Sequence, residues 1–252
     1  MSDFDRNVAA RGGFADRAAA VDAGLRAYML RVYNYMAAAV ALTGVVAWLC
    51  FQNAVVTNEA GAITGLTSFG QMTLGGYTPI ILMLATLGLV FFISFRIHTL
   101  QYTTALGLFM FYAALLGAAL TSVLVAYTGA SIARVFFISA ASFGALSLYG
   151  YTTQRDLSAM GSFLIMGLFG IIIASLVNIF LKSSGLDWAI SVIGVGVFAG
   201  LTAYDTQRIK EMYDSIDDDG TMGRKAVMGA LSLYLDFINL FLMLLRLVGD
   251  RR

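Results

Sequence analysis

Cysteine, histidine and proline are nearly absent from this 252-residue chain, which has one of each. Cys50 alone excludes an intrachain disulfide and a cysteine-based zinc site, and His98 alone excludes a metal site built from several histidines. Charge is also scarce, because Asp, Glu, Lys and Arg make up 12% of the residues, against about 25% in soluble domains. A net charge of +1 gives no electrostatic reason to expect a nucleic-acid partner.

Apolar residues dominate instead, at 59% of the chain, and the mean hydropathy is +0.80. They fall into runs of about 20 residues, the length that crosses a bilayer as one helix. The sequence therefore predicts an all-α membrane protein with seven transmembrane helices and the lipid bilayer as its surroundings. The predicted spans are Val32–Phe51, Thr78–Phe95, Thr103–Tyr127, Ile132–Tyr151, Ala159–Leu181, Trp188–Gln207 and Ala226–Val248.

The loops indicate an orientation. Eleven Lys and Arg residues lie on the side of the N-terminus and five on the other side. Cytoplasmic loops carry the excess of positive charge, so we expect a cytoplasmic N-terminus and an external C-terminus. The loop at 52–77, which has no Lys or Arg, is expected outside. Two parts are predicted, a mobile cytoplasmic segment at 1–28 with a short interfacial helix, and a seven-span domain at 29–252.

The seventh predicted span carries an aspartate, Asp236, near its centre. An unpaired charge there costs at least a few kcal/mol, so a carboxyl at this depth indicates function. A narrow polar stripe with i, i+3 and i+4 spacing runs along the same helix. Such a helix is expected inside a bundle, with its stripe turned away from lipid. The stripe consists of Ser232, Asp236, Asn239, Met243 and Arg246.

A second aspartate, Asp205, lies within the sixth predicted span. If that helix continues to about Ile216 and the chain turns at Asp217–Gly220, both carboxyls lie about 15 residues from the turn, roughly 22 Å along a helix. They would then sit at similar depth, a geometry that allows the two carboxyls to face each other. Arg208, one turn from Asp205, is a candidate partner for its charge.

Two close carboxyls in a medium of low dielectric share a proton more cheaply than both ionise. With Asn239 and backbone carbonyls they also offer oxygen ligands of the kind that Ca²⁺ takes, but fewer than the six to eight of a tight site. We therefore expect a proton-sensitive latch that Ca²⁺ occupies weakly and transiently at Asp205 and Asp236. No tightly bound cofactor is expected.

Three stretches resemble one family: AYDTQRIKEMY at 203–213, SLYLDFINLFLMLLRL at 232–247 and YGYTTQRDLSAMGSFLIMGL at 149–168. Together they look like the Bax inhibitor-1 family, in its bacterial YccA-like branch. The resemblance covers nearly the whole chain and implies a location in the bacterial inner membrane. It also implies seven helices with the last one surrounded by the other six.

The same resemblance implies a pH-dependent Ca²⁺ leak in which Asp205 and Asp236 are the proton-sensing pair. In the family an arginine on the second helix can pair with the first aspartate, and Arg96 is the arginine at that end here. Some bacterial members are linked to a membrane-bound ATP-dependent protease, so a non-channel regulator of a protease or of stress and cell-death machinery is a second hypothesis. An ion/proton exchanger would use the same aspartates.

Other classes find no support in the residues. A retinal pump needs a lysine in its last helix, and none lies between 226 and 248. The chain has no HExxH and no GxSxG motif, so an intramembrane metalloprotease or serine hydrolase is not indicated. We expect a protein that is not an enzyme.

Overall fold

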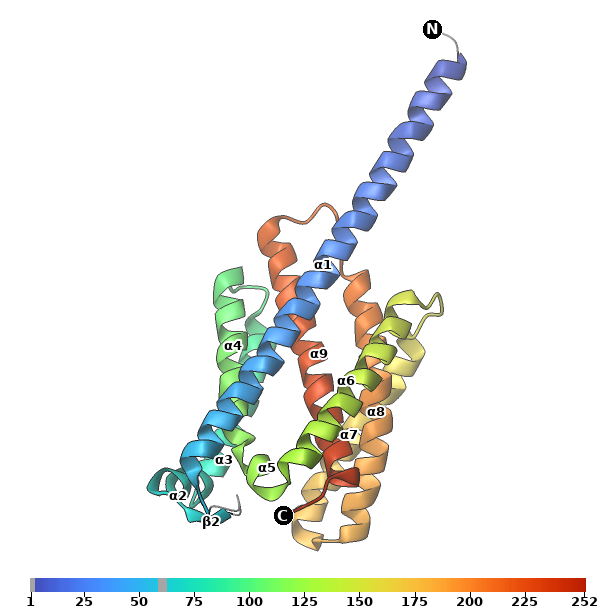
Figure 1. Ribbon diagram of the computed structural model, residues 1–252. Helices are drawn as coiled ribbons and strands as arrows, with labels where there is room; N and C mark the ends of the chain where they lie inside the picture. The colour runs from blue at the N-terminus through green and yellow to red at the C-terminus, as the bar shows by residue number, and fades with distance from the viewer. Residues whose placement is uncertain (1–2, 59–62) are drawn as a thin grey trace.

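A computed structural model describes the backbone at residues 3–58 and 63–252, and the side chains from residue 21 onward within those ranges. Almost all of it is helical (Figure 1). In chain order the elements are α1 (Asp3–Ala54), β1 (Val55–Thr57), β2 (Ile63–Leu66), α2 (Ser68–Leu74), α3 (Thr78–Arg96), α4 (Tyr102–Ala119), α5 (Thr121–Ala126), α6 (Gly129–Thr152), α7 (Ser158–Leu181), α8 (Ser184–Glu211) and α9 (Asp219–Val248).

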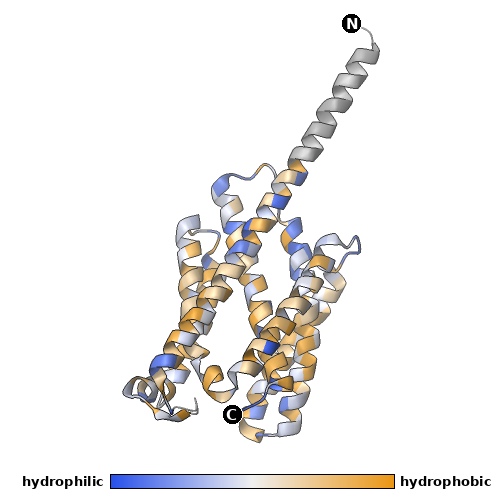
Figure 2. Ribbon diagram, in the orientation of Figure 1, coloured by the Kyte–Doolittle hydropathy of each residue, from blue (hydrophilic) through white to orange (hydrophobic). Residues whose placement is uncertain are grey.

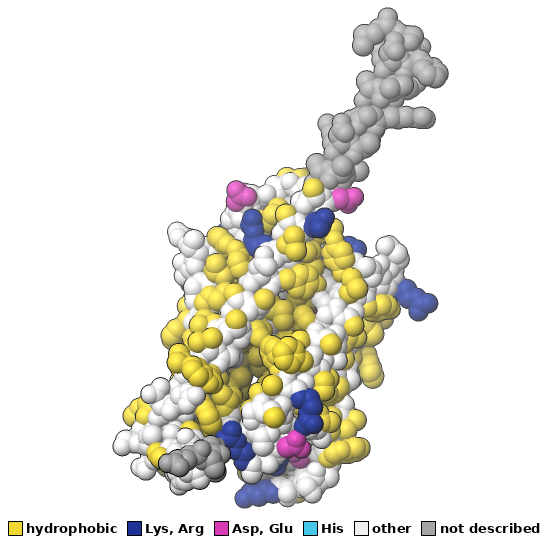
Figure 3. Space-filling view, viewed as in Figure 1, with side chains coloured by type: hydrophobic (Ala, Val, Ile, Leu, Met, Phe, Trp, Pro, Cys, Tyr) yellow, Lys and Arg dark blue, Asp and Glu magenta, His cyan; other side chains and the backbone are white. Residues whose placement is uncertain are grey.

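Within the described residues seven helical segments are long and apolar enough to cross a membrane, with α4 and α5 counted as one. The prediction of an all-α, seven-span membrane protein is confirmed. In lipid a helix satisfies its backbone hydrogen bonds within itself, which is why these apolar runs fold as they do. Apolar residues fill the middle of the bundle, and the charged side chains visible on one face gather towards its two ends (Figures 2 and 3).

The last helix, α9, is the most buried span. In its most apolar stretch of 18 residues, 67% is buried inside the bundle, compared with 11% in the corresponding stretches of α3 and of α7. It packs against α1, α4, α6 and α8, whereas α3 packs mainly on α4, and α7 on α8. The expected ring of all six other spans around α9 is therefore not confirmed: four spans contact α9 closely and two form the flanks.

Glycines set some of these helix contacts. At Gly150 of α6 an added Cβ would lie 2.2 Å from the carbonyl oxygen of Ala203 in α8. At Gly223 of α9 it would meet the ring of Tyr102 at 2.5 Å. Such close approaches are typical of membrane helices, where small residues let backbones come together.

Three boundaries differ from the sequence prediction. The third span breaks at Leu120 into α4 and α5. The loop predicted at 52–77 contains an antiparallel pair, β1 and β2, and the short helix α2. The helix of the sixth span, predicted at Trp188–Gln207, ends at Glu211 and does not continue to about Ile216. The last helix, α9, begins at Asp219, because the Asp218 side chain accepts hydrogen bonds from the N–H groups of Gly220 and Thr221 and caps the helix.

The C-terminal residues are tied to the junction of α5 and α6. The Thr128 N–H donates to the Asp250 carbonyl at 3.0 Å, and the Asp250 N–H donates to the Ser131 hydroxyl at 2.9 Å. Arg134 and Asp250 form an ion pair with 2.6 Å between Nη2 and Oδ2. These contacts anchor the C-terminal end of α9 to the start of α6. The predicted segment at 1–28 falls mostly on residues whose side chains lie outside the described part, so that division stays a prediction.

Candidate functional site

Asp236 lies on the buried face of α9, and its side chain is 5% exposed. Its Oδ2 atom is buried and has no hydrogen-bond partner among the residues that the structure describes. Most buried polar groups in proteins do have a partner, because an unpaired one loses its hydration without compensation. A carboxyl kept in this state, in the most buried span, is the strongest sign of a functional site in the molecule.

Asp205 lies on α8 and is half-buried. Its carboxyl lies close enough to that of Asp236 for the two groups to interact electrostatically. The expectation that the two aspartates face each other thus agrees with their positions, although the turn on which it was based is placed differently.

The packing of α8 on α9 explains how they meet. Gly229 lies against the side chain of Ile209, and Gly194 lies against Met243. These two contacts are 15 residues apart on α8 and 14 on α9, so the two antiparallel helices keep nearly the same register between them. Asp205 and Asp236 both lie between the two contacts. The helices are staggered at their ends: Asp205 is six residues from the end of α8, and Asp236 is 17 residues from the start of α9.

The positively charged side chain that interacts with Asp205 is Arg208, which lies one turn further along α8 and is exposed. Arg96 is the exposed last residue of α3, a helix that packs on α4 rather than on α8. The described structure therefore brings Arg208 to Asp205 and leaves Arg96 on a helix that does not pack closely on α8.

Asn239 lines a cavity of about 940 Å³ that opens towards the C-terminal end of the bundle. Its Nδ2 donates to the carbonyl of Leu235 on its own helix at 2.8 Å. Met243 and Arg246 of the predicted stripe line the same cavity. The stripe is thus divided, with Asp236 turned to Asp205 and the rest of its C-terminal half turned to the cavity.

A set of polar contacts fixes α8 beside Asp205, and the sequence reasoning did not find it. The Thr206 and Ser147 hydroxyls lie 2.9 Å apart, and Ser147 contacts the Tyr33 hydroxyl at 2.6 Å. The Gln207 side chain donates to the Arg155 carbonyl and accepts from the Leu157 N–H. The sequence feature that could have indicated these contacts is the polar run Asp205-Thr206-Gln207. Thr206 contacts α6, and Gln207 contacts the loop between α6 and α7.

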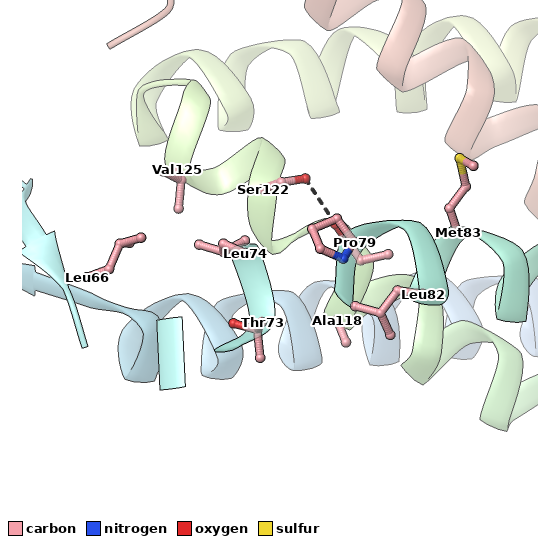
Figure 4. Close-up of a pocket in the computed structure, with 10 residues that line it drawn as sticks. Leu66, Thr73, Leu74, Pro79, Leu82, Met83, Ala118, Ser122 and Val125 are labelled. Atoms are coloured by element: carbon pink, nitrogen blue, oxygen red, sulfur yellow. Dashed lines mark hydrogen bonds between the residues drawn. The ribbon is translucent and has the colours of Figure 1, made fainter. Parts of the chain in front are cut away.

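Other features offer less. No cluster of three or more His, Cys, Asp or Glu side chains occurs in the described part of the chain, so a metal would find only two carboxylates here. A pocket of about 390 Å³ lies where β2 and α2 meet α3 and α5 (Figure 4). The Thr73 hydroxyl already donates to the Phe69 carbonyl of its own helix, and the Ser122 hydroxyl donates to the Ala119 carbonyl at the end of α4. The pocket therefore offers few groups to a polar ligand.

The chain was compared with known proteins. A family model described as "Inhibitor of apoptosis-promoting Bax1" matches residues 25–252. Protein RP147 of Rickettsia prowazekii is 52% identical over 236 residues, 92% of each chain. The inner membrane protein YbhL of Escherichia coli K12 is 48% identical over 232 residues, 91% of this chain and 94% of YbhL. A Caulobacter vibrioides protein is 44% identical over the full length of both. With the seven-span fold, these matches show that the chain belongs to the Bax inhibitor-1 family of membrane proteins.

Proposed function

We propose that this protein is a pH-sensitive calcium leak channel of the bacterial inner membrane, gated by protonation of Asp205 and Asp236. One observation carries the proposal: Asp236 is buried in the most enclosed span with an unpartnered oxygen, and a second carboxyl lies against it. The description of the relative YbhL as an inner membrane protein supports the location. The excess of Lys and Arg on the N-terminal side supports a cytoplasmic N-terminus.

The surroundings of the pair suggest a path for the ion. From the C-terminal side the cavity lined by Asn239 reaches Leu235, the residue next to Asp236. From the other side Asp205 lies one turn from the exposed Arg208. A Ca²⁺ ion that arrives between them meets two carboxylates and an amide, fewer than the six to eight oxygens that would hold it tightly. Weak coordination is what conduction requires.

Protonation changes the forces between α8 and α9. A shared proton removes the repulsion between the two carboxylates and favours close packing of the helices. It also weakens the attraction between Asp205 and Arg208, which acts in the opposite sense. The direction of the pH response depends on which effect is larger, so it is an outcome of the measurement.

The test is Ca²⁺ flux into proteoliposomes between about pH 5 and pH 8, the range in which a carboxyl pair sharing a proton is expected to titrate. We expect wild type to show a pH-dependent flux, and Asp236→Asn and Asp205→Asn each to flatten the response while the protein stays folded. Asp219→Asn is the matched control, since Asp219 is an exposed aspartate in the first turn of the same helix as Asp236.

Wild-type pH–flux curves in both aspartate variants would refute the gate. Absence of flux above empty liposomes, with folded protein verified, would refute the channel and favour the regulator hypothesis. A pulldown of membrane-bound protease with and without residues 1–28 would then be the next experiment.

A further inference from the structure

The cavity beside Asn239 has the depth of one leaflet of a membrane. It is lined by α7 from Leu168 to Ile179, by α8 from Asp187 to Phe198 and by α9 from Leu235 to Arg246. Each stretch contains 12 residues, and its first and last residues lie about 16 Å apart along the helix at 1.5 Å per residue. Half of a hydrocarbon core about 30 Å thick is about 15 Å. The length of the cavity therefore matches one fatty-acid chain of one leaflet.

The walls and the mouth of the cavity differ in chemistry. The inner walls are mostly apolar, with Ile171, Ile190 and Phe198 among their buried residues. Three charged side chains, Asp187, Arg246 and Arg251, lie at the C-terminal end. Two guanidinium groups against one carboxylate leave a net positive charge at the mouth. An apolar channel with cationic groups at one end is complementary to an anionic amphiphile.

The two arginines have donors to spare. Arg246 Nη1 lies 3.8 Å from Asp187 Oδ1, and both side chains are more than 40% exposed, so this ion pair is long and solvated. The guanidinium of Arg251 lies 5.7 Å from the centre of the Tyr127 ring. Its interaction with Tyr127 raises the pKa of Arg251, which therefore keeps its charge. Neither contact uses all five N–H groups of a guanidinium.

The cavity has access from the bilayer. On the α3 side its wall consists of Met83 and Leu87, which are 58% and 48% exposed. In the described structure α3 packs mainly on α4 and α7 on α8, so α3 and α7 do not pack closely on each other. A chain from a neighbouring lipid can enter sideways without crossing a polar surface.

We propose that this cavity binds one acyl chain of an anionic phospholipid from the leaflet on the C-terminal side, with the headgroup phosphate held by Arg246 and Arg251. The phosphate would accept hydrogen bonds from the guanidinium groups, for which phosphate and guanidinium geometries are matched. The acyl chain would cover the apolar walls. Binding of lipid and passage of an ion are different properties, so the proposal does not rest on the channel.

The first test measures headgroup preference by native mass spectrometry of protein released from nanodiscs with equal phosphatidylglycerol and phosphatidylcholine. We expect about fivefold more retained phosphatidylglycerol, which corresponds to about 1 kcal/mol for one net cationic side chain. Arg251→Gln should lower this ratio and Asp187→Asn should raise it. Equal retention of the two lipids by wild type, or a ratio that moves in the same direction in both variants, would overturn the headgroup assignment.

The second test fills the cavity. Ser175 of α7 lines it, so Ser175→Phe should cut the amount of retained lipid at least fivefold. Ser162→Phe makes the same chemical change at an exposed position of α7 that does not line the cavity and should retain lipid as wild type does. If Ser175→Phe retains as much lipid as Ser162→Phe, the lipid is not in this cavity and the proposal fails.

Discussion

Substitution of Gly150 by alanine tests how tightly α6 must pack on α8. An added Cβ would lie 2.2 Å from the Ala203 carbonyl oxygen, and real Cβ atoms essentially never come closer than 3.0 Å to such an atom. The two backbones would therefore have to separate by at least 0.8 Å. Because the obstacle is backbone and not the end of a flexible side chain, no rotamer change relieves it. Ala203 is two residues from Asp205, so the displacement acts next to the site.

The size of the effect follows from a comparison within the same helix. At Gly144 of α6 an added Cβ meets no atom within 4 Å. Alanine in place of glycine improves helix propensity by up to about 1 kcal/mol at both positions, so this gain cancels between the two variants. What remains is the cost of overpacking at Gly150, typically about 1–3 kcal/mol. We expect Gly150→Ala to be less stable than Gly144→Ala by that amount.

The assay is equilibrium unfolding of both variants and wild type in the same detergent micelles, followed by loss of helical circular dichroism. Gly144→Ala should unfold at the wild-type denaturant concentration or slightly above it, and Gly150→Ala at a lower one. Equal stability of the two alanine variants would refute the claim that the backbone contact of Gly150 with Ala203 is required.

Two further substitutions test contacts elsewhere. Tyr234→Phe removes a hydroxyl that lies 2.7 Å from Thr43 Oγ1 and links α9 to α1, so the free energy of unfolding should fall by about 0.6 kcal/mol, at most about 1.7. Tyr112→Phe is the control, because the Tyr112 hydroxyl shows no hydrogen-bond partner in the described part. Equal losses of stability in the two variants would count against the prediction. Hydrogen bonds from Thr221 and Gly220 lower the pKa of Asp218. Their stabilisation is therefore present above the ordinary aspartate pKa of about 3.9 and lost as the pH falls through the lower folded value. Asp218→Ala should thus lower the melting temperature at pH 7 and differ less from wild type in acid, whereas Asp219→Ala should change it little at either pH.

The seven spans could be predicted from the sequence because each needs only a long apolar run, a property of composition. The break at Leu120 could not, because Thr121 and Ser122, which follow it, leave the stretch from Tyr102 to Ala126 apolar enough to form one span. The end of α8 was misplaced for another reason. Aspartate is typical both of turns and of helix N-caps, and Asp218, which lies within the predicted turn at Asp217–Gly220, is the cap of α9.

The two aspartates of the candidate site could be predicted because a charged carboxyl inside a membrane span costs free energy and is therefore conspicuous within an apolar run. Their supports were not conspicuous. Ser147 is one small polar residue in α6, and nothing in its own helix indicates that it contacts both Tyr33 and Thr206. Gln207 follows the same pattern, because its partners are backbone groups of a loop 50 residues earlier. Contacts between distant segments depend on the packing of α6 on α8, which hydropathy does not encode.

The division of the α9 stripe links the two proposals. Asp236 faces Asp205 on α8, while Asn239, Met243 and Arg246 line the cavity that reaches Leu235, the residue beside Asp236. A helix whose polar groups served only packing would have them turned to neighbouring helices along its whole length. Here the C-terminal half instead lines a space about one leaflet deep with charges at its mouth. An acyl chain in that space would occupy the route by which an ion from the C-terminal side reaches Asp236. Lipid and ion would then exclude each other, and the same apolar walls that suit the lipid would keep water from the aspartates when the lipid is bound.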